Sequence, residues 1–281
     1  MIMFSMYCDA TEAWRESFQA MGPWFSLLTD QFVCLTIPSN LTNPQSFCKS
    51  RDELRGLLSQ HDPHAFPSPR LHHTSIFQIF EAFEKNSHCS FTLQQNFTCT
   101  GGCQIQHEIL YLPNTCNSGG WMDAARRTGF SCMLDNVYLQ LFLNLQIVVK
   151  IQQRRRSCCN QCQRPCASTS IFLCNPSLWL FFLLPPNIHP HPQPSSALEI
   201  GSGTDVTTYQ LFAVVYYNNT HFTSIWMNND ASCWGHDGLA RNGRPEQLHS
   251  TDLTTLQNYI GSNPHHVIYS LNRSSTSQQT S

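Results

Sequence analysis

The chain has 281 residues, enough to bury a sizeable core, and only 12% of them are charged, with 16 Lys and Arg against 18 Asp and Glu. Ordinary soluble domains carry about 25% charged residues, so uncharged polar side chains supply much of the polarity here. The near-neutral balance excludes a generic nucleic-acid coat, and a hydrophobic content of 41% excludes a disordered tail.

The first part of the chain predicts helices separated by loops. Apolar side chains recur at helical spacing from Asp9 to about Met21, with acids in the first turn, and Pro23 is expected to end this helix. Frequent prolines predict a loop over residues 39–69, interrupted by a short helix at residues 52–60. A second apolar stripe predicts a helix over residues 75–85.

From residue 89 onward the pattern alternates with the period of β-strands. Residues 89–99 and 104–112 predict a hairpin whose turn contains Gly101 and Gly102. Residues 121–127 are interpreted as a short amphipathic helix, and residues 178–184 as an apolar strand. Prolines and glycines between residues 185 and 205 predict a surface loop.

The clearest strand signals come last. Residues 209–217, 221–227, 231–237 and 266–272 predict an antiparallel meander with tight Asn-rich turns. Helices followed by such a meander indicate an α+β fold. No internal repeat is found.

The chain has fourteen cysteines, and the redox state of its cellular compartment decides whether they form disulfides. The first nine residues contain no basic residue and reach an acid at Asp9, so no signal peptide is predicted. The most apolar long stretch, residues 133–151, carries too many polar groups to span a bilayer. We therefore expect a soluble protein of the cytoplasm or nucleus, whose cysteines are thiols, metal ligands or a nucleophile.

His221 and Asp237 form the first candidate for chemistry. His221 begins a strand expected in mid-sheet, and Asp237 ends the next strand, so a hairpin can bring the two side chains together. A carboxylate at that place accepts the imidazole N–H and fixes its tautomer, which is the role of the third group in nucleophile–base–orienter sets. The alternative is a surface hairpin with an incidental histidine and aspartate.

Cys8 is the candidate nucleophile. It immediately precedes the first predicted helix, where the helix dipole and free N–H groups favour the thiolate. A cysteine at a helix start, combined with a distant His and an acid, follows the logic of papain-like cysteine peptidases. The alternative is a buried small hydrophobic residue that happens to begin a helix, and the adjacent Asp9 disfavours a thiolate.

Two cysteine pairs suggest a metal site. Cys99 and Cys103 are separated by three residues, and Cys159 and Cys162 by two. Two such pairs on turns can present four thiolates tetrahedrally to zinc, with unligated thiols as the alternative. Two further cysteines, Cys158 and Cys166, are alternative ligands. A run of three arginines beside the second pair, Arg154, Arg155 and Arg156, is interpreted as a solvated loop.

The chain resembles the ubiquitin-specific proteases from about residue 89 to residue 273. Residues 209–217, followed by a turn, His221 and Phe222, are similar to the family's histidine box. Trp234 and Asp237 resemble the tryptophan and aspartate that follow it, and residues 267–273 resemble the closing strand. The cysteine pairs fall where the family's zinc-bearing fingers lie. The likeness is greatest to divergent versions in fungal and transposon-associated genes.

The resemblance implies a papain-like cysteine peptidase with one domain over residues 1–281. Residues 1–88 would be the helical lobe, 89–184 the fingers-like region, 205–273 the antiparallel sheet and 274–281 a tail. The implied reaction is cleavage of an isopeptide after the C-terminal Gly-Gly of ubiquitin or a ubiquitin-like modifier.

The resemblance also assigns the roles within this site. Cys8 would be the nucleophile and its own N–H an oxyanion donor, with His221 as base and then acid, oriented by Asp237. Cys99, Cys103, Cys159 and Cys162 would hold structural Zn²⁺, with no organic cofactor.

Two other interpretations stay open. The first is a catalytically dead ubiquitin-binding protein, favoured because no asparagine occurs among residues 1–7, where the family places an oxyanion-hole donor. The second is a zinc-knuckle nucleic-acid module of a mobile element, disfavoured by the near-neutral charge and the lack of an aromatic and basic stripe. Contact with a membrane is not expected.

Overall fold

The computed structural model describes part of the chain, which divides into two compact units, Met1–His88 and Cys89–Ser281. The described residues are 6, 8, 12–20, 23–35, 44–64, 66–67, 92–103, 106–111, 139–140, 143–144, 159, 161–174, 176, 178–184, 193–202, 205–218, 221–227, 232–237, 239–240, 245–248, 259 and 262–271. The expected helices at residues 75–85 and 121–127, Cys158 and the arginine run lie outside them.

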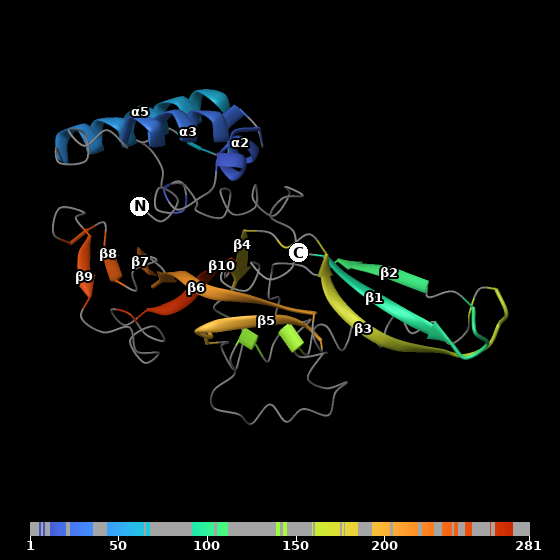
Figure 1. The fold of residues 1–281 in the computed structure, drawn as a ribbon. Coiled ribbons are helices and arrows are strands. Elements are labelled where there is room, and N and C mark those ends of the chain that lie inside the picture. The colour runs from blue at the N-terminus through green and yellow to red at the C-terminus, as the bar shows by residue number, and fades with distance from the viewer. Residues whose placement is uncertain are drawn as a thin grey trace. The chain divides into compact units, whose positions relative to one another are not determined.

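The first unit is helical in its described part. Its helices are α2 (Glu12–Ala20), α3 (Pro23–Leu35) and α5 (Pro44–His61), visible in Figure 1. The prediction of a helix near residues 9–21 is confirmed where the chain is described. The expectation for Pro23 is wrong, because Pro23 begins α3 instead of only ending the helix before it.

The mostly looped interpretation of residues 39–69 is also wrong, since α5 spans 18 residues from Pro44 onward. Both errors have one physical reason. A proline fits the first turn of a helix because the N–H that it lacks would have no intrahelical acceptor there. No described helix is long and apolar enough to cross a membrane.

A small core holds the helical unit together. The rings of Phe18 in α2 and Phe25 in α3 meet edge to face, with centroids 4.9 Å apart. Leu28 of α3 and Leu58 of α5 are buried as well. Packing of α2 against α3 and of α3 against α5 holds the described helices of this unit together, while the Thr29 hydroxyl donates to the carbonyl of Phe25 at 3.0 Å within α3.

The second unit contains a three-stranded antiparallel sheet in its described residues. Its strands are β1 (Thr92–Cys99), β2 (Gln106–Tyr111) and β3 (Cys166–Cys174), in the order β2-β1-β3 (Figure 1). The predicted hairpin is confirmed, with Thr92 opposite Tyr111 and Phe97 opposite Gln106. The strand β3 was not predicted.

A larger antiparallel sheet, seven-stranded in the described residues, forms the rest of this unit, in the order β4-β10-β6-β7-β8-β9, with β5 also paired to β6. The strands are β4 (Trp179–Leu183), β5 (Ala197–Ser202), β6 (Asp205–Tyr217), β7 (Phe222–Met227), β8 (Cys233–Asp237), β9 (Glu246–Leu248) and β10 (Asn263–Leu271). The predicted meander is confirmed: β6, β7 and β8 are consecutive neighbours, and β10 pairs with β6.

The expected surface loop at residues 185–205 is wrong for its last part, which forms β5. Leu198 and Ile200 alternate with the exposed Glu199 and are almost fully buried. The outer edge of β5 is covered by the side chain of Gln140, which binds both backbone groups of Glu199. The described part of the chain is mainly antiparallel sheet with few helices.

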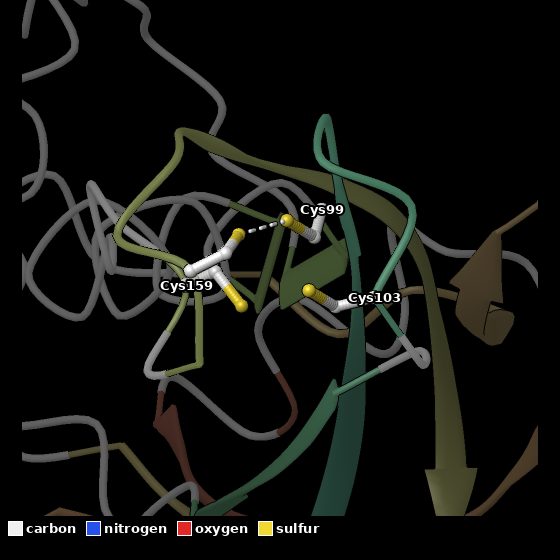
Figure 2. A group of neighbouring side chains, drawn as sticks. Cys99, Cys103 and Cys159 are labelled. Carbon is white, nitrogen blue, oxygen red and sulfur yellow. Dashed lines mark hydrogen bonds between the residues drawn. The ribbon is translucent and has the colours of Figure 1, made fainter.

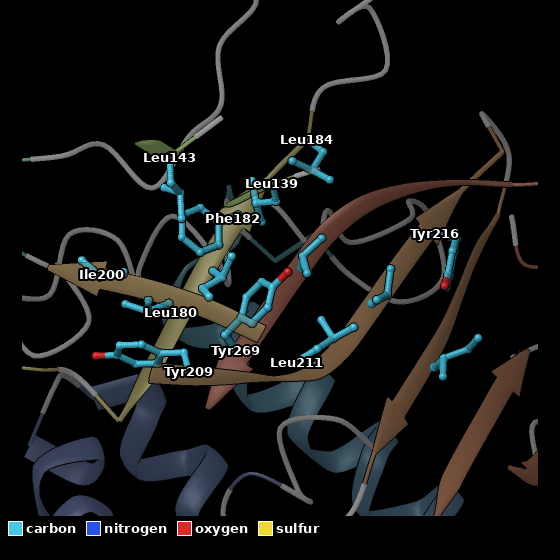
Figure 3. Close-up of a cluster of buried hydrophobic side chains, with 14 of the residues drawn as sticks. Leu139, Leu143, Leu180, Phe182, Leu184, Ile200, Tyr209, Leu211, Tyr216 and Tyr269 are labelled. Atoms are coloured by element: carbon cyan, nitrogen blue, oxygen red, sulfur yellow. The ribbon is translucent and has the colours of Figure 1, made fainter. Parts of the chain in front are cut away.

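The core of the second unit joins both of its sheets. Leu93 of β1 and Leu173 of β3 belong to the same buried cluster as Tyr209 and Tyr269 of the larger sheet. Figure 3 shows how the side chains of this cluster gather over β4, β5, β6 and β10. Tyr269 also receives a hydrogen bond from the Ser195 N–H at 3.0 Å and donates to the Ser195 carbonyl at 2.9 Å.

Candidate functional site

His221 and Asp237 lie together on adjacent strands. His221 directly precedes β7, and Asp237 ends β8, its antiparallel neighbour. Nε2 of His221 is 2.6 Å from Oδ1 of Asp237. Each side chain is about one fifth exposed, at 21% and 20%, so the pair is accessible but not immersed in water.

A hydrogen-bonded turn fixes the backbone of His221. Its N–H donates to Oδ1 of Asn218 at 2.8 Å, and the Asn218 N–H donates to the His221 carbonyl at 3.3 Å. The rings of Tyr217 and Phe222, which face each other across the hairpin, are stacked with centroids 4.5 Å apart. The buried His265 of β10 lies edge-on to both rings. The backbone that carries the imidazole is therefore held in place by this turn and by the packed rings.

The Asp237 carboxylate is held by its own chain as well as by the imidazole. Oδ1 accepts the N–H of Leu239 at 2.9 Å and the N–H of Ala240 at 3.3 Å. Burial acts to raise the pKa of Asp237, but the hydrogen bonds from Leu239, His221 and Ala240 outweigh it and lower this pKa. The carboxylate is thus ionised at neutral pH and available to orient the imidazole.

The geometry assigns the two nitrogens of His221 different tasks. Because Asp237 is acceptor-only when ionised, Nε2 carries the proton, and Nδ1 of the neutral ring is an acceptor. No described residue forms a hydrogen bond with Nδ1. Such a ring is oriented to take a proton from a nearby acidic group and to be stabilised as imidazolium by the carboxylate.

Cys8 belongs to the other unit. The sequence places it just before the first helix, but its own backbone is helical, as is that of Met6 two residues earlier. The Cys8 side chain is exposed, which argues against the alternative of a buried small hydrophobic residue. Its carbonyl accepts a hydrogen bond from the Arg15 guanidinium at 3.0 Å.

Four cysteine thiols form a second site at one end of the three-stranded sheet (Figure 2). The Sγ atoms of Cys99, Cys103, Cys159 and Cys162 all lie within 4.8 Å of one another. Figure 2 labels Cys99, Cys103 and Cys159 of this group. Cys99 is the last residue of β1 and pairs with Cys166, which begins β3. Strand pairing therefore brings together two turns that are about 60 residues apart in sequence. The side chain of Cys166, an alternative ligand by sequence, lies outside what the structure describes.

Backbone hydrogen bonds shape both turns around the sulfurs. The N–H of Gly101 donates to Sγ of Cys99 at 3.1 Å, and the N–H of Gly102 donates to the Cys99 carbonyl at 3.1 Å. In the second turn, the N–H of Gln163 donates to the Cys159 carbonyl at 2.9 Å. Gly102 and Gln163 have positive φ angles of 77° and 59°, as the tight reversals require.

The donor set fits a metal ion that prefers sulfur. Hydrogen bonds from the N–H groups of Cys162 and Gln161 lower the pKa of Cys159 to about 6, and the N–H of Gly101 lowers that of Cys99. The hydrogen bond with Cys162 and burial raise the pKa of Cys103 to about 12. Tetrahedral zinc with Zn–S bonds of about 2.3 Å places its sulfurs about 3.8 Å apart, close to the spacing here. These four thiols could hold a metal ion.

The structure adds supporting residues that the sequence analysis did not single out. Asn218 and the N–H groups of Leu239 and Ala240 fix the dyad, and Gly101 fixes the first cysteine turn. An Asn directly before a turn is a known signal for a side-chain-to-backbone hydrogen bond, so Asn218 could have been found. The N–H donors to Asp237 could not, because backbone donors carry no residue type.

Comparison with known proteins gives no family model that matches the chain and no match among curated proteins. Similar solved structures are of the SAGA DUB module, which contains Ubp8, Sgf11, Sus1 and Sgf73. One, bound to monoubiquitin, is 10% identical over 70% of this chain and 46% of that chain, with a TM-score of 0.36.

Two further structures of the same module give similar values. A form bound to ubiquitin aldehyde is 9% identical over 88% of this chain and 54% of that chain, with a TM-score of 0.35. A form with a shortened Sgf11 is 11% identical over 97% of this chain and 63% of that chain, with a TM-score of 0.42. This chain thus spans about half the length of the solved chains that it resembles.

Proposed function

We propose that this protein is a cysteine-type isopeptidase that removes ubiquitin or a ubiquitin-like modifier from lysine. The observation that carries the proposal is the short contact between Nε2 of His221 and Oδ1 of Asp237. A histidine held in this way, with Nδ1 left as acceptor, is the base of a thiol-activating set. The sequence resemblance to ubiquitin-specific proteases in the histidine box supplies the class of substrate.

In the proposed first half-reaction, His221 Nδ1 takes the proton of the Cys8 thiol, and the thiolate attacks the carbonyl carbon of the isopeptide. The carbonyl oxygen becomes an oxyanion, stabilised by the Cys8 N–H. The imidazolium, stabilised by Asp237, then gives its proton to the lysine amine. The C–N bond breaks, free lysine leaves, and a thioester to Cys8 remains.

The second half-reaction restores the thiol. His221, neutral again, takes a proton from water as the water oxygen attacks the thioester carbon. The C–S bond breaks, the C-terminal glycine leaves as a carboxylic acid, and the imidazolium returns its proton to the Cys8 sulfur. Asp237 keeps the same hydrogen bond to Nε2 through both halves, so the ring need not reorient between steps.

We assign a structural role to the metal site, with Zn²⁺ as the ion. When bound, zinc would cross-link the ends of β1 and β3 through Cys99, Cys103, Cys159 and Cys162. Four thiolates leave no open position for substrate or water, which is the usual arrangement of structural zinc. The zinc ion would therefore hold the three-stranded sheet and take no part in the chemistry.

The test is covalent labelling with ubiquitin that carries a cysteine-reactive group at its C-terminus, followed by peptide mapping. We expect modification at Cys8, abolished by Cys8→Ala and reduced by about a hundredfold in rate by His221→Ala. Cys174→Ala is the matched control, since this half-buried thiol has a pKa raised by burial and lies on β3.

Labelling of Cys8 that is unchanged by His221→Ala would contradict the proposed base. A folded protein that binds the probe but is modified at no cysteine would instead indicate a ubiquitin-binding protein without turnover. Binding is read separately, with unmodified ubiquitin, so that the two results are not confused.

A further inference from the structure

Thr223 lies directly across from Asp237 on the neighbouring strand. The two are paired residues of β7 and β8, and on the other side Thr223 is paired with Tyr216 of β6. Paired residues of antiparallel strands project from the same face with Cβ atoms about 4.5–5.5 Å apart. The Thr223 side chain therefore has the fully buried Tyr216 on one side and the Asp237 carboxyl group on the other.

The Thr223 hydroxyl is buried and lacks a hydrogen bond. Only 4% of this residue is exposed, and no described residue bonds to Oγ1. A hydroxyl removed from water without a partner costs folding free energy, so buried hydroxyls are nearly always paired. This threonine lies two residues after His221 on the same strand face, where a buried hydroxyl without a hydrogen bond is unexpected.

The second carboxylate oxygen of Asp237, Oδ2, is available as a hydrogen-bond acceptor. The hydrogen bonds that the structure shows to its carboxylate, from His221, Leu239 and Ala240, all reach Oδ1. A carboxylate offers about four acceptor positions on its two oxygens. Among the described residues, Oδ2 accepts no hydrogen bond, so contacts at Oδ1 alone orient the carboxylate against the imidazole.

We propose that Thr223 is a positioning residue, whose hydroxyl donates a hydrogen bond to Oδ2 of Asp237 and so fixes the carboxylate plane against His221. The proposed bond requires Oγ1 to turn toward the carboxyl group by rotation about the Cα–Cβ bond to another staggered position. This bond satisfies the buried hydroxyl and holds both carboxylate oxygens from opposite sides. The inference rests on the His221–Asp237 pair of the proposed function, but not on turnover.

The test compares Thr223→Val, which keeps the shape and removes the hydroxyl, with Thr223→Ser, which keeps the hydroxyl. The ¹³C signal of the Asp237 carboxyl, identified by its loss in Asp237→Asn, is followed against pH. Losing a donor to the ionised form raises a carboxyl pKa, so we expect an increase of about one unit in the valine variant and almost none in the serine variant. An unchanged pKa in the valine variant would overturn the inference.

Urea unfolding gives a second readout with opposite signs for the two possibilities. If the hydroxyl donates to Asp237, Thr223→Val lowers the folding equilibrium constant by roughly tenfold at pH 7, and Asp237→Asn shrinks that effect. If the hydroxyl has no partner, valine stabilises the protein, which refutes the proposal. Where the valine variant does not fold, Thr223→Ser against Thr223→Ala makes the same comparison with a smaller side chain.

The two proposals fail separately. A protein that never reacts with the ubiquitin probe, yet shows the increased Asp237 pKa in Thr223→Val, retains the positioning role and loses the isopeptidase role. A protein that reacts at Cys8 while Thr223→Val leaves the Asp237 pKa unchanged retains the enzyme and loses the positioning role.

Discussion

At the scale of single residues, the ionised Asp237 makes the stability of the protein depend on pH. Because hydrogen bonds lower its pKa in the folded protein, it contributes stability above the pKa of an unfolded aspartate, about 3.9, and loses this contribution as pH falls through the lower folded pKa. The carboxylate therefore stays charged over the whole range in which histidine titrates.

We predict that Asp237→Asn is less stable than the wild type at pH 7 and that the difference shrinks below about pH 4. Asparagine keeps the shape and lacks the charge, so the pH-dependent part of the difference reports the carboxylate. Urea unfolding at pH 7, 5 and 3 measures it. A difference that stays constant over this range would mean that the Asp237 pKa is not lowered.

Gly235 of β8 shows a steric limit at the same scale. A Cβ built on it would overlap with Oη of Tyr259 and lie 3.2 Å from Cζ of the same ring. The ring is in the core cluster and packs beside Tyr216, so it has little room to move.

We predict that Gly235→Ala destabilises the protein by about 1–3 kcal/mol through this overlap. Tyr259→Phe, which removes the closest atom, should recover part of the loss in the double variant. A double-mutant cycle by urea unfolding gives the coupling energy. Additive effects would show that the alanine is accommodated without contact to Tyr259.

At the scale of elements, β5 shows how an exposed strand edge is protected. The Gln140 amide donates to the Glu199 carbonyl at 2.9 Å and accepts the Glu199 N–H at 2.7 Å, as a neighbouring strand would. Unpaired edges invite pairing with other chains, so one side chain here replaces a strand.

We predict that Gln140→Ala lowers stability by about 1–2 kcal/mol and increases aggregation, since the two hydrogen bonds to Glu199 are lost and the edge is opened. Asn144→Ala is the control, because Asn144 accepts a hydrogen bond from the same amide at 3.0 Å and forms none with the described residues of β5. Urea unfolding and light scattering measure the two effects. Equal behaviour of both variants would assign the effect to the helical turn and not to the edge.

The first cysteine turn depends on a glycine beside the sulfurs. A Cβ on Gly101 would lie 2.9 Å from Sγ of Cys162 and 3.3 Å from Sγ of Cys99. A Cβ on Gly102 would have no atom within 4 Å, so space does not require glycine there. Glycine is favoured at this position by the positive φ of 77°.

We predict that Gly101→Ala weakens zinc binding by about tenfold or more, because the sulfurs must move apart. Gly102→Ala should cost about 1 kcal/mol of turn strain without pushing on a sulfur, and so affect zinc binding less. Competition with a coloured chelator gives both affinities. A larger loss in Gly102→Ala would mean that turn strain, and not crowding, limits the site.

At the scale of the whole molecule, the metal site joins turns that the chain places far apart. A cross-link between the ends of β1 and β3 closes a loop of about 60 residues. Closing a long loop removes more entropy from the unfolded chain than closing a short one, so the stabilisation is larger. Its effect should appear in the unit formed by residues 89–281.

We predict about one zinc per chain after purification, and a melting temperature about 10 °C lower after its removal by chelation. Cys159→Ser should behave as the metal-free protein, whereas Cys233→Ser, a change at a buried thiol away from the site, should retain zinc. Metal analysis and calorimetry measure both. A chain that melts at the same temperature with and without chelator would contradict a structural metal.

Much of the fold could be predicted because its signals are local. The run of apolar and aromatic residues at 209–217 and the Asn-rich turns around His221 identify the meander without any long-range information. The helices beginning at Pro23 and Pro44 were not predicted, because a proline can end a helix or begin one, and only the packing of α3 against α2 and of α5 against α3 distinguishes these uses.

The sequence by itself determined the first hairpin, the meander that joins His221 to Asp237, and the residue types able to bind metal, but not the strands β3, β5 and β9. The tertiary structure decided which cysteines meet, which carboxylate oxygen is occupied, and that Thr223 lies opposite Asp237. The reason is physical: periodicity is a property of neighbouring residues, whereas the pairing of β1 with β3 is set by contacts across a long loop that no local pattern encodes.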